Sequence, residues 1–265
     1  MHSRKPMSDL QSKSDRPKIR VGTAAWAIPR DVRSRFSGEG SLLQKYSHVL
    51  SAVEINSSFY RDHKPQTYVK WAATVPSDFK FSVKLAKRFT HENRLRSTEG
   101  LTEVLEQYRG LGANWGALLV QLPPSLAFEH DVSRKFWKAL RKDYTGPVAF
   151  EPRHRTWVEP DAKALLHEFA IARVVADPDP LPTDGAEARN SGAAPELQYY
   201  RLHGSPVIYK SEYELCGLRQ WRARLEAEPA REVWCIFDNT TFGHATTNAL
   251  WLQDNWGESC DKSVA

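Results

Sequence analysis

Short apolar runs separated by longer stretches of mixed character recur along this chain at roughly thirty-residue intervals, a spacing typical of repeated βα units. Eight such runs are present, and they are Ile19–Ala25, Ala52–Asn56, Phe79–Lys84, Ala117–Gln121, Val148–Glu151, Ala172–Asp177, Tyr199–His203 and Val233–Asn239. Most of the stretches between them carry apolar residues at helical spacing. Eight units of this kind close naturally into a (β/α)8 barrel. The pattern therefore predicts an α/β fold with a single TIM-type barrel.

The predicted helices begin at recognisable residues. Ser41 can cap a helix that runs through Ser51, and Pro65 occupies the first turn of the next one. Later helices are expected over about 98–109, 132–142 and 212–227, with another after Pro160. Residues 178–196 differ because they are rich in Pro, Gly and Ala, which favours a loop. The unit between the sixth and seventh strands is therefore expected to be degenerate.

Alternation within the runs decides which side chains face the barrel interior. In the run AVEIN, Val53 and Ile55 share one face, and Glu54 and Asn56 share the other. The polar pair is expected to face inward, because helices cover the outer side of a barrel. Most of the other runs also end in polar side chains, namely Lys84, Gln121, Glu151, Asp177, His203 and Asp238. Since barrel enzymes carry their chemistry at the C-terminal ends of the strands, these positions predict the site.

An open, doubly wound sheet is the alternative fold for the same spacing of apolar runs. It usually carries a Gly-rich phosphate-binding turn after its first strand. The segment VGTAAWAIPR at 21–30 has no GxGxxG pattern, and no GxxxxGK[ST] pattern occurs anywhere in the chain. We therefore expect one barrel domain over residues 19–256, preceded by a disordered polar leader at 1–18 and followed by a flexible tail at 257–265.

Net charge and cysteine content bear on the partners and the cellular compartment of the protein. The formal net charge is +5, and residues 1–18 contribute +3 of it. A role for this leader on phosphate backbones stays open, but the pattern favours a solvated terminus over a nucleic-acid-binding face. The three cysteines form no CxxC pair, which is typical of a reducing compartment. With no apolar run of about 20 residues and no apolar N-terminal segment, we expect a cytoplasmic protein without membrane association.

Several segments form a recognisable series along the chain. They are VGTAAW at 21–26, VEINSSFYR at 53–61, FKFSVK at 79–84, TH at 90–91, LLVQLPPS at 118–125, FEPRHRTW at 150–157, YRLHG at 200–204 and Asn248–Leu250. Together they resemble the YecE-like family, known as domain of unknown function 72, over about residues 20–255. The resemblance implies a TIM-type barrel and says little about activity. The chain departs from the family pattern after Trp26, after Gly204 and at Asp238-Asn239, so the substrate-facing loops are less well covered by it.

The predicted mouth of the barrel combines carboxylates with cations, which favours an anionic ligand. Glu54 and Glu151 are the candidate acid–base pair, with His203 as a further catalytic residue that carries protons. The predicted substrate-binding residues are Asn56, Lys84, His91, Gln121, Arg153, His154 and Arg201, with Trp26 and Tyr60 as aromatic walls. The resulting hypothesis is a hydrolase or isomerase that acts on a small anionic compound, phosphorylated and sugar- or nucleotide-like.

Three other interpretations of the mouth stay open. In the first, Glu54–Lys84 and Glu151–Arg201 are structural ion pairs that fill the barrel. In the second, a divalent metal serves a phosphodiesterase or nuclease of AP-endonuclease-like type, with the ligands Glu151, Asp177, His203 and Asp238. The nearby cations would repel such an ion and no HExxH motif occurs, so no cofactor is predicted. In the third, the protein binds nucleic acid or a metabolite without turnover.

Overall fold

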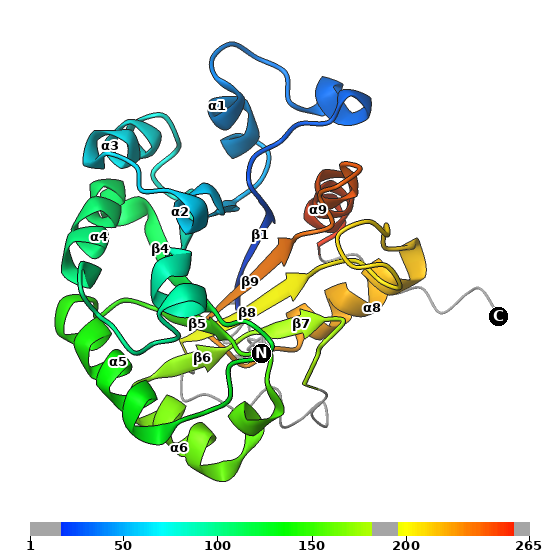
Figure 1. The fold of residues 1–265 in the computed structure, drawn as a ribbon. Helices are drawn as coiled ribbons and strands as arrows, with labels where there is room; N and C mark the ends of the chain where they lie inside the picture. The colour runs from blue at the N-terminus through cyan, green and yellow to red at the C-terminus, as the bar shows by residue number, and fades with distance from the viewer. Residues whose placement is uncertain (1–16, 182–195, 257–265) are drawn as a thin grey trace, which may run out of the picture.

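Parallel strands form a barrel at the centre of the protein, and the helices pack around its outside (Figure 1). The computed structural model describes residues 17–181 and 196–256. Its strands are β1 (Lys18–Ala24), β2 (Ala52–Ile55), β3 (Lys80–Lys84), β4 (Trp115–Gln121), β5 (Val148–Glu151), β6 (Ile171–Arg173), β7 (Val175–Asp177), β8 (Leu197–Leu202) and β9 (Glu232–Phe237). Their order in the sheet is β6-β5-β4-β3-β2-β1-β9-β8-β7, and the paired strands are parallel.

The sixth predicted strand joins the two ends of this sheet. β6 pairs with β5, β7 pairs with β8, and only Val174 separates the two short strands. The Val174 amide donates to the Phe150 carbonyl at 2.8 Å, which extends the pairing with β5 beyond β6. The two strands are thus successive halves of one segment that changes its partner along its length. The predicted barrel is confirmed, with the run over Ala172–Asp177 divided into β6 and β7.

Helices connect the strands on the outer side of the barrel. They are α1 (Leu42–Ser47), α2 (Ser57–Tyr60), α3 (Pro65–Ala73), α4 (Leu101–Tyr108), α5 (His130–Asp143), α6 (Pro160–Glu168), α8 (Leu215–Glu226) and α9 (His244–Asp254). Shorter helical turns are η1 (Arg30–Arg35), η2 (Arg88–Glu92), η3 (Arg109–Asn114) and η4 (Arg155–Val158).

The start of α1 follows the prediction and its end does not. The Ser41 hydroxyl accepts from the Gln44 amide at 3.3 Å, and the Gln44 side chain accepts from the Ser41 amide at 2.8 Å, so Ser41 caps the helix reciprocally. The prediction of a helix through Ser51 is wrong, because α1 ends at Ser47. Beyond it the amides of residues 49 and 50 both donate to the Tyr46 carbonyl, which tightens the chain into the turn before β2.

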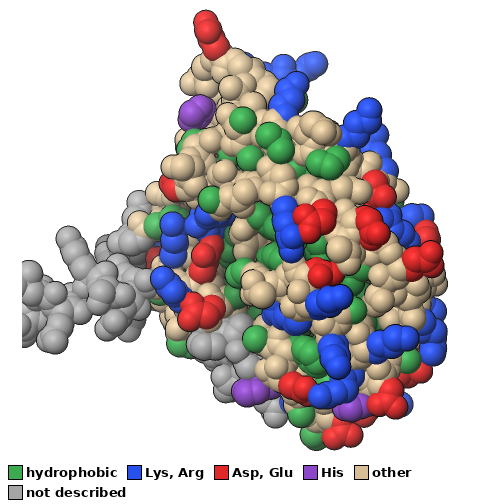
Figure 2. All heavy atoms as spheres, turned by 90° about the vertical axis from the view of Figure 1, so that its left-hand side faces the viewer, with side chains coloured by type: hydrophobic (Ala, Val, Ile, Leu, Met, Phe, Trp, Pro, Cys, Tyr) green, Lys and Arg blue, Asp and Glu red, His purple; other side chains and the backbone are tan. Residues whose placement is uncertain are grey.

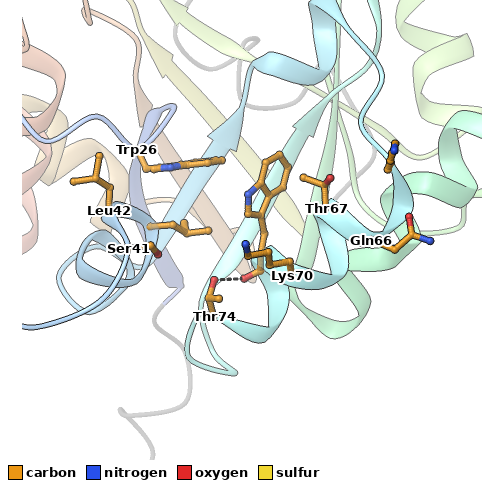
Figure 3. A pocket seen from close by; sticks show the side chains of 10 residues that line it. Trp26, Ser41, Leu42, Gln66, Thr67, Lys70 and Thr74 are labelled. Atoms are coloured by element: carbon orange, nitrogen blue, oxygen red, sulfur yellow. Dashed lines mark hydrogen bonds between the residues drawn. The ribbon is translucent and has the colours of Figure 1, made fainter.

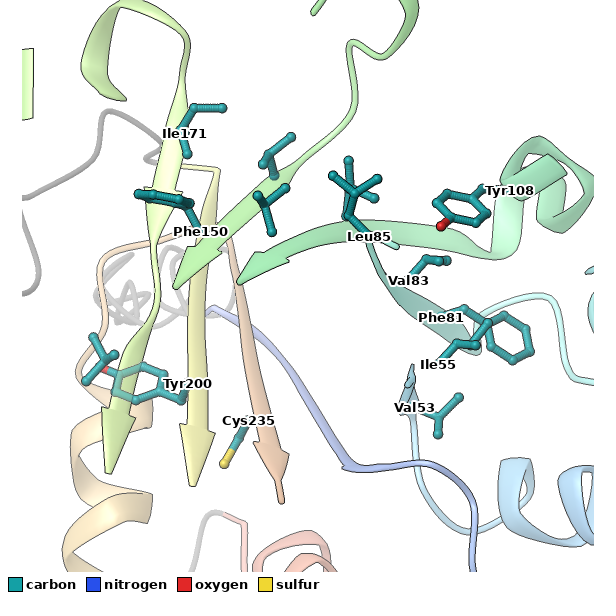
Figure 4. Packing of buried hydrophobic residues seen from close by; sticks show 14 of the residues in the cluster. Val53, Ile55, Phe81, Val83, Leu85, Tyr108, Phe150, Ile171, Tyr200 and Cys235 are labelled. Atoms are coloured by element: carbon teal, nitrogen blue, oxygen red, sulfur yellow. The ribbon is translucent and has the colours of Figure 1, made fainter. Parts of the chain in front are cut away.

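The larger apolar layer lies between the strands and the helices. Figure 4 shows outward-facing strand side chains of this layer, among them Val53, Ile55, Phe81 and Phe150, which are at most 1 % exposed. The alternation predicted for β2 is confirmed, since Val53 and Ile55 belong to this layer and Glu54 does not. Burial of such side chains provides most of the stabilisation of the fold.

A smaller apolar cluster fills the barrel interior. It consists of Ala24, Ala52, Ala117, Leu119, Ala149, Ala172, Val174, Leu197, Tyr199, Trp234 and Ile236. The alanines leave room for two large rings, and Tyr199 stacks on Trp234 with centroids 5.7 Å apart and planes 14° apart. Towards the C-terminal ends of the strands this cluster gives way to long polar side chains.

Parts of the predicted organisation lie outside the described residues. These parts are residues 1–16 of the leader, the tail at 257–265 and residues 182–195 of the unit predicted to be degenerate. Lys18 was assigned to the leader, which is wrong by one residue, because Lys18 begins β1 and lies in register with Glu232 of β9. Among the residues described, every helix is too short or too polar to span a bilayer.

Candidate active site

Seven polar side chains converge at the C-terminal ends of the strands. This mouth cluster consists of Glu54, Lys84, Gln121, Glu151, Arg201, His203 and Asp238, each at most 8 % exposed. Strand alternation brings most of them inward, because they stand two residues beyond side chains of the interior cluster. Buried charges persist only when they are paired or hydrogen-bonded, so their partners define what this site can do.

Arg201 is the centre of the mouth cluster and binds three carboxylates. Its Nε and Nη2 donate to the two oxygens of Glu54 at 3.0 and 2.8 Å, and Nη1 donates to Glu151 at 2.6 Å. Nη2 also donates to Asp238 at 2.9 Å. All three guanidinium nitrogens are thus engaged, and the side chain is fully buried. This geometry speaks against the predicted contact between Arg201 and an anionic substrate.

Glu54, one half of the predicted acid–base pair, is held from two sides. Besides Arg201, the Tyr199 hydroxyl donates to its Oε2 at 3.0 Å. The suggested structural ion pair between Glu54 and Lys84 is wrong, because the carboxylate binds Arg201 instead. Sequence reasoning missed Tyr199, although the alternation that places Arg201 inside the barrel also places Tyr199 there.

Glu151, the second residue of the predicted acid–base pair, accepts hydrogen bonds on both carboxylate oxygens. Gln121 donates to Oε2 at 3.0 Å, and Arg153 donates to Oε1 at 3.0 Å. Burial favours the neutral acid, but the charge of Arg201, together with His203 and Arg153, outweighs burial and holds the pKa of Glu151 well below its usual range. Glu151 is therefore ionised at neutral pH. The suggested structural ion pair between Glu151 and Arg201 is present in this arrangement.

Arg153 joins the mouth cluster to the loop after β8. Its side chain is 21 % exposed, so it reaches from buried Glu151 toward solvent. Its Nη2 also donates to the Tyr209 hydroxyl at 3.4 Å, and the Tyr209 ring lies 5.5 Å from the ring of His203. Tyr209 was missed from the sequence because strand alternation says nothing about a loop.

His203 lies between two carboxylates. Its Nδ1 is 3.0 Å from Oδ2 of Asp238, and its Nε2 is 3.4 Å from Oε1 of Glu151. Burial disfavours the imidazolium, but the hydrogen bond with Asp238 and the nearby carboxylate of Glu151 outweigh it and raise the pKa of His203. Burial likewise disfavours the Asp238 anion, yet Arg201 and His203 lower the pKa of Asp238. His203 thus carries a proton more readily than a free histidine does.

Lys84 is the one cation of the mouth cluster that forms no ion pair with any described residue. Its Nζ instead lies 4.5 Å from the centroid of the Phe59 ring. Burial and the charge of Arg201 lower the pKa of Lys84 to about 8, although the carboxylates of Glu54, Glu151 and Asp238 act in the opposite direction. The amine is therefore charged at neutral pH and loses its proton more easily than a surface lysine does.

His91 lies beside this lysine, on η2. Its ring packs edge-on against Phe59 at 4.9 Å, and its Nδ1 is 2.9 Å from the Thr90 hydroxyl. Burial, followed by the charges of Lys84 and Arg153, lowers the pKa of His91. A neutral histidine and a buried lysine thus contact the same aromatic side chain, with Arg153 close enough to influence the histidine.

The other predicted binding residues have the following surroundings. His154 caps η4, with Nδ1 3.0 Å from the Thr156 hydroxyl. Tyr60 is 71 % exposed on α2 and packs on Phe59. The Oδ1 atom of Asn56 is buried and has no hydrogen-bond partner in the part of the chain that the structure describes.

Trp26 lines a groove between α1 and α3 (Figure 3). It packs edge-on against Trp71 with ring centroids 5.2 Å apart. The groove has a volume of about 620 Å³ and is also lined by Leu42, Lys70 and Thr74. The seven residues of the mouth cluster do not line this groove.

The metal-site alternative requires four ligands that this structure does not bring together. Asp177 accepts from the Tyr213 hydroxyl at 2.6 Å instead of joining Glu151, His203 and Asp238. Arg201 bonds to both Glu151 and Asp238 and so supplies the positive charge that a metal would bring. Within residues 17–181 and 196–256, no group of three His, Cys, Asp or Glu side chains is arranged to hold a metal ion.

The outer face that carries α4, α5 and α6 has mixed charge. Figure 2 shows Lys and Arg side chains interleaved with Asp and Glu on this side of the molecule. Several are paired, including Arg96 with Glu129 and Arg134 with Glu168, each at 2.5 Å. A nucleic-acid interface usually requires a continuous basic surface, which this face does not present.

Comparisons with known proteins agree with this fold. A family model described as "Protein of unknown function DUF72" matches residues 20–264. The chain is similar to UPF0759 protein YecE of Escherichia coli K12, with 26 % identity over 170 residues that cover 62 % of this chain and 60 % of YecE. It therefore spans about three fifths of that relative's length. UPF0759 protein YunF of Bacillus subtilis 168 is 24 % identical over 261 residues, which cover 87 % of this chain and 92 % of YunF.

A solved structure shows the same architecture. The crystal structure of a DUF72 family protein from Enterococcus faecalis V583 superposes with a TM-score of 0.70 at 19 % identity, covering 89 % of this chain and 94 % of that chain. At this level of identity the likeness concerns the fold alone, and the chemistry has to be argued from the side chains present here.

Proposed function

The chain belongs to the DUF72 family, whose function is unknown, and we propose a function for it from its own side chains. We propose that it is an enzyme that binds a small anionic substrate, phosphorylated and sugar- or nucleotide-like, at the C-terminal mouth of the barrel. The reaction is a hydrolysis or an isomerisation driven by acid–base chemistry. Because the match to YecE covers only part of that relative, this proposal takes nothing from it.

One observation carries the proposal. The three carboxylates of the mouth cluster are all bound to Arg201, whereas the ammonium group of Lys84 has no ion-pair partner among the described residues. A buried cation without a partner is costly, so such a lysine is retained where a ligand supplies the missing charge. A phosphate or carboxylate at Lys84 would do so, and half-buried Arg153 offers it a second cation.

The acid–base roles shift from the carboxylates to the histidines in this proposal. The pKa of His91 is lowered and that of His203 is raised, so the two imidazoles differ in their protonation near neutral pH. Titratable groups whose surroundings separate their pKa values are suited to act as base and acid. His91 is then the proton acceptor and His203 the proton donor. Glu54 and Glu151 serve as positioning residues for Arg201 and His203.

Anion binding by the purified protein tests the proposal. Calorimetric titration with inorganic phosphate, then with sugar phosphates and nucleoside monophosphates, would be made on the wild type, Arg153→Met and Lys87→Met. We expect Arg153→Met to weaken phosphate binding by about tenfold or more, because it removes a charged hydrogen-bond donor. Lys87→Met is the matched control, since that ammonium is paired with Glu92 at 2.9 Å. Equal phosphate affinity in wild type and Arg153→Met would contradict the proposed site.

A second variant separates an enzyme from a protein that only binds. His91→Gln keeps the cations of the mouth, so it should retain anion affinity. If the protein is an enzyme, this variant loses turnover of any substrate that the titrations identify. If His91→Gln kept full turnover, His91 would not be the proton acceptor of the reaction.

A further inference from the structure

Lys84 has features that go beyond binding an anion through its charge. The residue stands at the C-terminal end of β3 and is only 8 % exposed, and its amine has an aromatic ring on one side. Charge alone would be supplied equally well by arginine, which keeps its proton under all ordinary conditions. A lysine, unlike an arginine, can become a neutral nucleophile.

The surroundings of Lys84 favour the neutral amine in two ways. The side chain is desolvated within the barrel mouth, and Arg201 adds a second positive charge nearby. Desolvation and a neighbouring cation are the two recognised ways of activating a lysine for attack on a carbonyl group. The carboxylates of Glu54, Glu151 and Asp238 favour the ammonium form from a distance, but each of them forms its ion pair with Arg201 and none with Lys84.

We infer that Lys84 forms an imine with the carbonyl group of an aldehyde or ketone that also bears a phosphate or carboxylate group. This inference rests on the proposed function and names the substrate class for the same site. Arg153 is the cation placed to hold the anionic group, because its partly exposed side chain extends from Glu151 toward solvent. The carbonyl carbon would then face the Lys84 amine, beside His91 and the Phe59 ring.

The step balances without an oxidant or a reductant. The nitrogen lone pair of the neutral amine forms a bond to the carbonyl carbon, and the π electrons of the carbonyl group move to its oxygen. One proton passes from nitrogen to that oxygen, with His91 in place to relay it. A further proton from solvent converts the hydroxyl group to water. Water leaves as the nitrogen lone pair completes the carbon–nitrogen double bond, which gives a protonated imine.

Pyridoxal 5′-phosphate is a suitable probe, because it carries an aldehyde and a phosphate on one small molecule. The protein would be incubated with one equivalent of the probe, reduced with sodium borohydride and analysed by peptide mass spectrometry. We expect one label per chain, at Lys84, with about tenfold or greater preference over pyridoxal, which lacks the phosphate. Inorganic phosphate should protect the site.

Two variants and a control make the result decisive. Lys84→Arg keeps the positive charge and should retain phosphate binding while losing the label. Lys84→Met should also lose the label, and it provides a second test if the larger arginine prevents folding. Lys87→Arg changes a lysine whose ammonium is paired with Glu92, and it should be labelled like the wild type. Labelling spread over many lysines, or unchanged in both Lys84 variants, would overturn the inference.

The same samples distinguish this inference from the proposed function. If the wild type binds phosphate and is not labelled by the probe, the imine is wrong and the anion site stands. If the wild type neither binds phosphate nor takes the label, both proposals are wrong.

Discussion

At the scale of single residues, Lys84 is a buried charge that forms no ion pair with any described residue. Burial and Arg201 lower its pKa to about 8, below its ordinary value of 10.5. The unfolded chain therefore binds the proton of Lys84 more tightly than the folded chain does. It follows that this residue reduces stability at pH 7 and that the loss disappears as the pH rises from about 8 to about 10.5.

Removing the amine should consequently stabilise the protein. We expect Lys84→Met to raise the free energy of unfolding by about 1–3 kcal/mol at pH 7, with a smaller gain at pH 10. Urea unfolding at both pH values measures this difference. Lys87→Met, at a paired surface lysine, should stay within about 0.5 kcal/mol of the wild type. A Lys84→Met protein that is less stable than the wild type at pH 7 would show that the ammonium group is well compensated.

Arg201 has the opposite character, because the fold depends on its charge. Arg201→Met would leave three buried carboxylates without their main partner, and we expect a loss of about 3–5 kcal/mol or a failure to fold. Arg35→Met removes an exposed arginine that pairs with Asp254 at 2.9 Å, and it should cost less than about 1 kcal/mol. Similar losses in the two variants, measured by denaturant unfolding, would contradict the central position of Arg201.

At the scale of elements, β1 and β2 approach closely at Gly22. A Cβ atom on this residue would lie 2.1 Å from the Ala52 carbonyl oxygen, a backbone atom that cannot move independently. Gly22 also lies in register with Ala52, so any separation would disturb the pairing of the two strands. The closeness of these strands thus depends on the absence of a side chain.

Gly22→Ala is therefore expected to destabilise the barrel by about 2 kcal/mol or more, because the strands have to part. The matched control is Gly217→Ala in α8, where a Cβ atom would meet nothing within 4 Å. Alanine has a higher helix propensity than glycine, so we expect the free energy of unfolding to rise by about 0.5–1 kcal/mol in this variant. Thermal unfolding of both variants checks the contrast, and equal effects would refute the steric explanation.

The strands were predictable because their apolar residues form short runs whose alternation matches a two-sided environment. The division into β6 and β7 was not, since a change of partner at Val174 leaves no mark in the local pattern. The early end of α1 was missed for a related reason. Leu50 continues the apolar face of the helix, yet the Val49 amide already donates to the carbonyl three residues back, at Tyr46, which tightens the last turn.

The candidate site was predictable in position and only partly in chemistry. Strand ends located Glu54, Glu151 and Arg201 at the mouth, but their pairing depends on which side chains meet across the barrel. The pair of Glu151 and Arg201 was among the suggested ion pairs, whereas the contact of Arg201 with Glu54, 147 positions away, has no local sign in the sequence. Because the carboxylates of the mouth cluster all bind Arg201, Lys84 has no ion-pair partner among the residues that the structure describes, and this follows only from the assembled barrel.

At the scale of the whole molecule, the mouth cluster connects distant parts of the barrel. Arg201 on β8 bonds to Glu54 on β2, to Glu151 on β5 and to Asp238 just beyond β9. These strands are not all neighbours in the sheet, so the bonds run across the interior. The charges thus stabilise the closed form of the barrel as well as shaping its site.

Low pH should therefore lower the free energy of unfolding of the barrel. The pKa values of Glu151 and Asp238 are lowered in the folded state, so their contribution is present above about pH 4 and is lost as the pH falls through the lowered values. We expect the urea midpoint to fall steeply below about pH 4. Glu151→Gln should be less stable than the wild type at pH 7, and its free energy of unfolding should fall less than that of the wild type as the pH is lowered. If the stability of Glu151→Gln fell with pH as much as that of the wild type, protonation of Glu151 would not contribute to the loss of stability in acid.

The most direct test of the central claim is the titration of Lys84 itself. Carbon-13 NMR of the lysine side chains, with Lys84→Arg to assign the signal, would follow its pKa with and without inorganic phosphate. We predict a pKa near 8 in the free protein that rises when phosphate is added, because a bound anion favours the ammonium form. A pKa near 10.5 that phosphate leaves unchanged would mean that Lys84 is an ordinary solvated lysine, and the proposed anion site would be wrong.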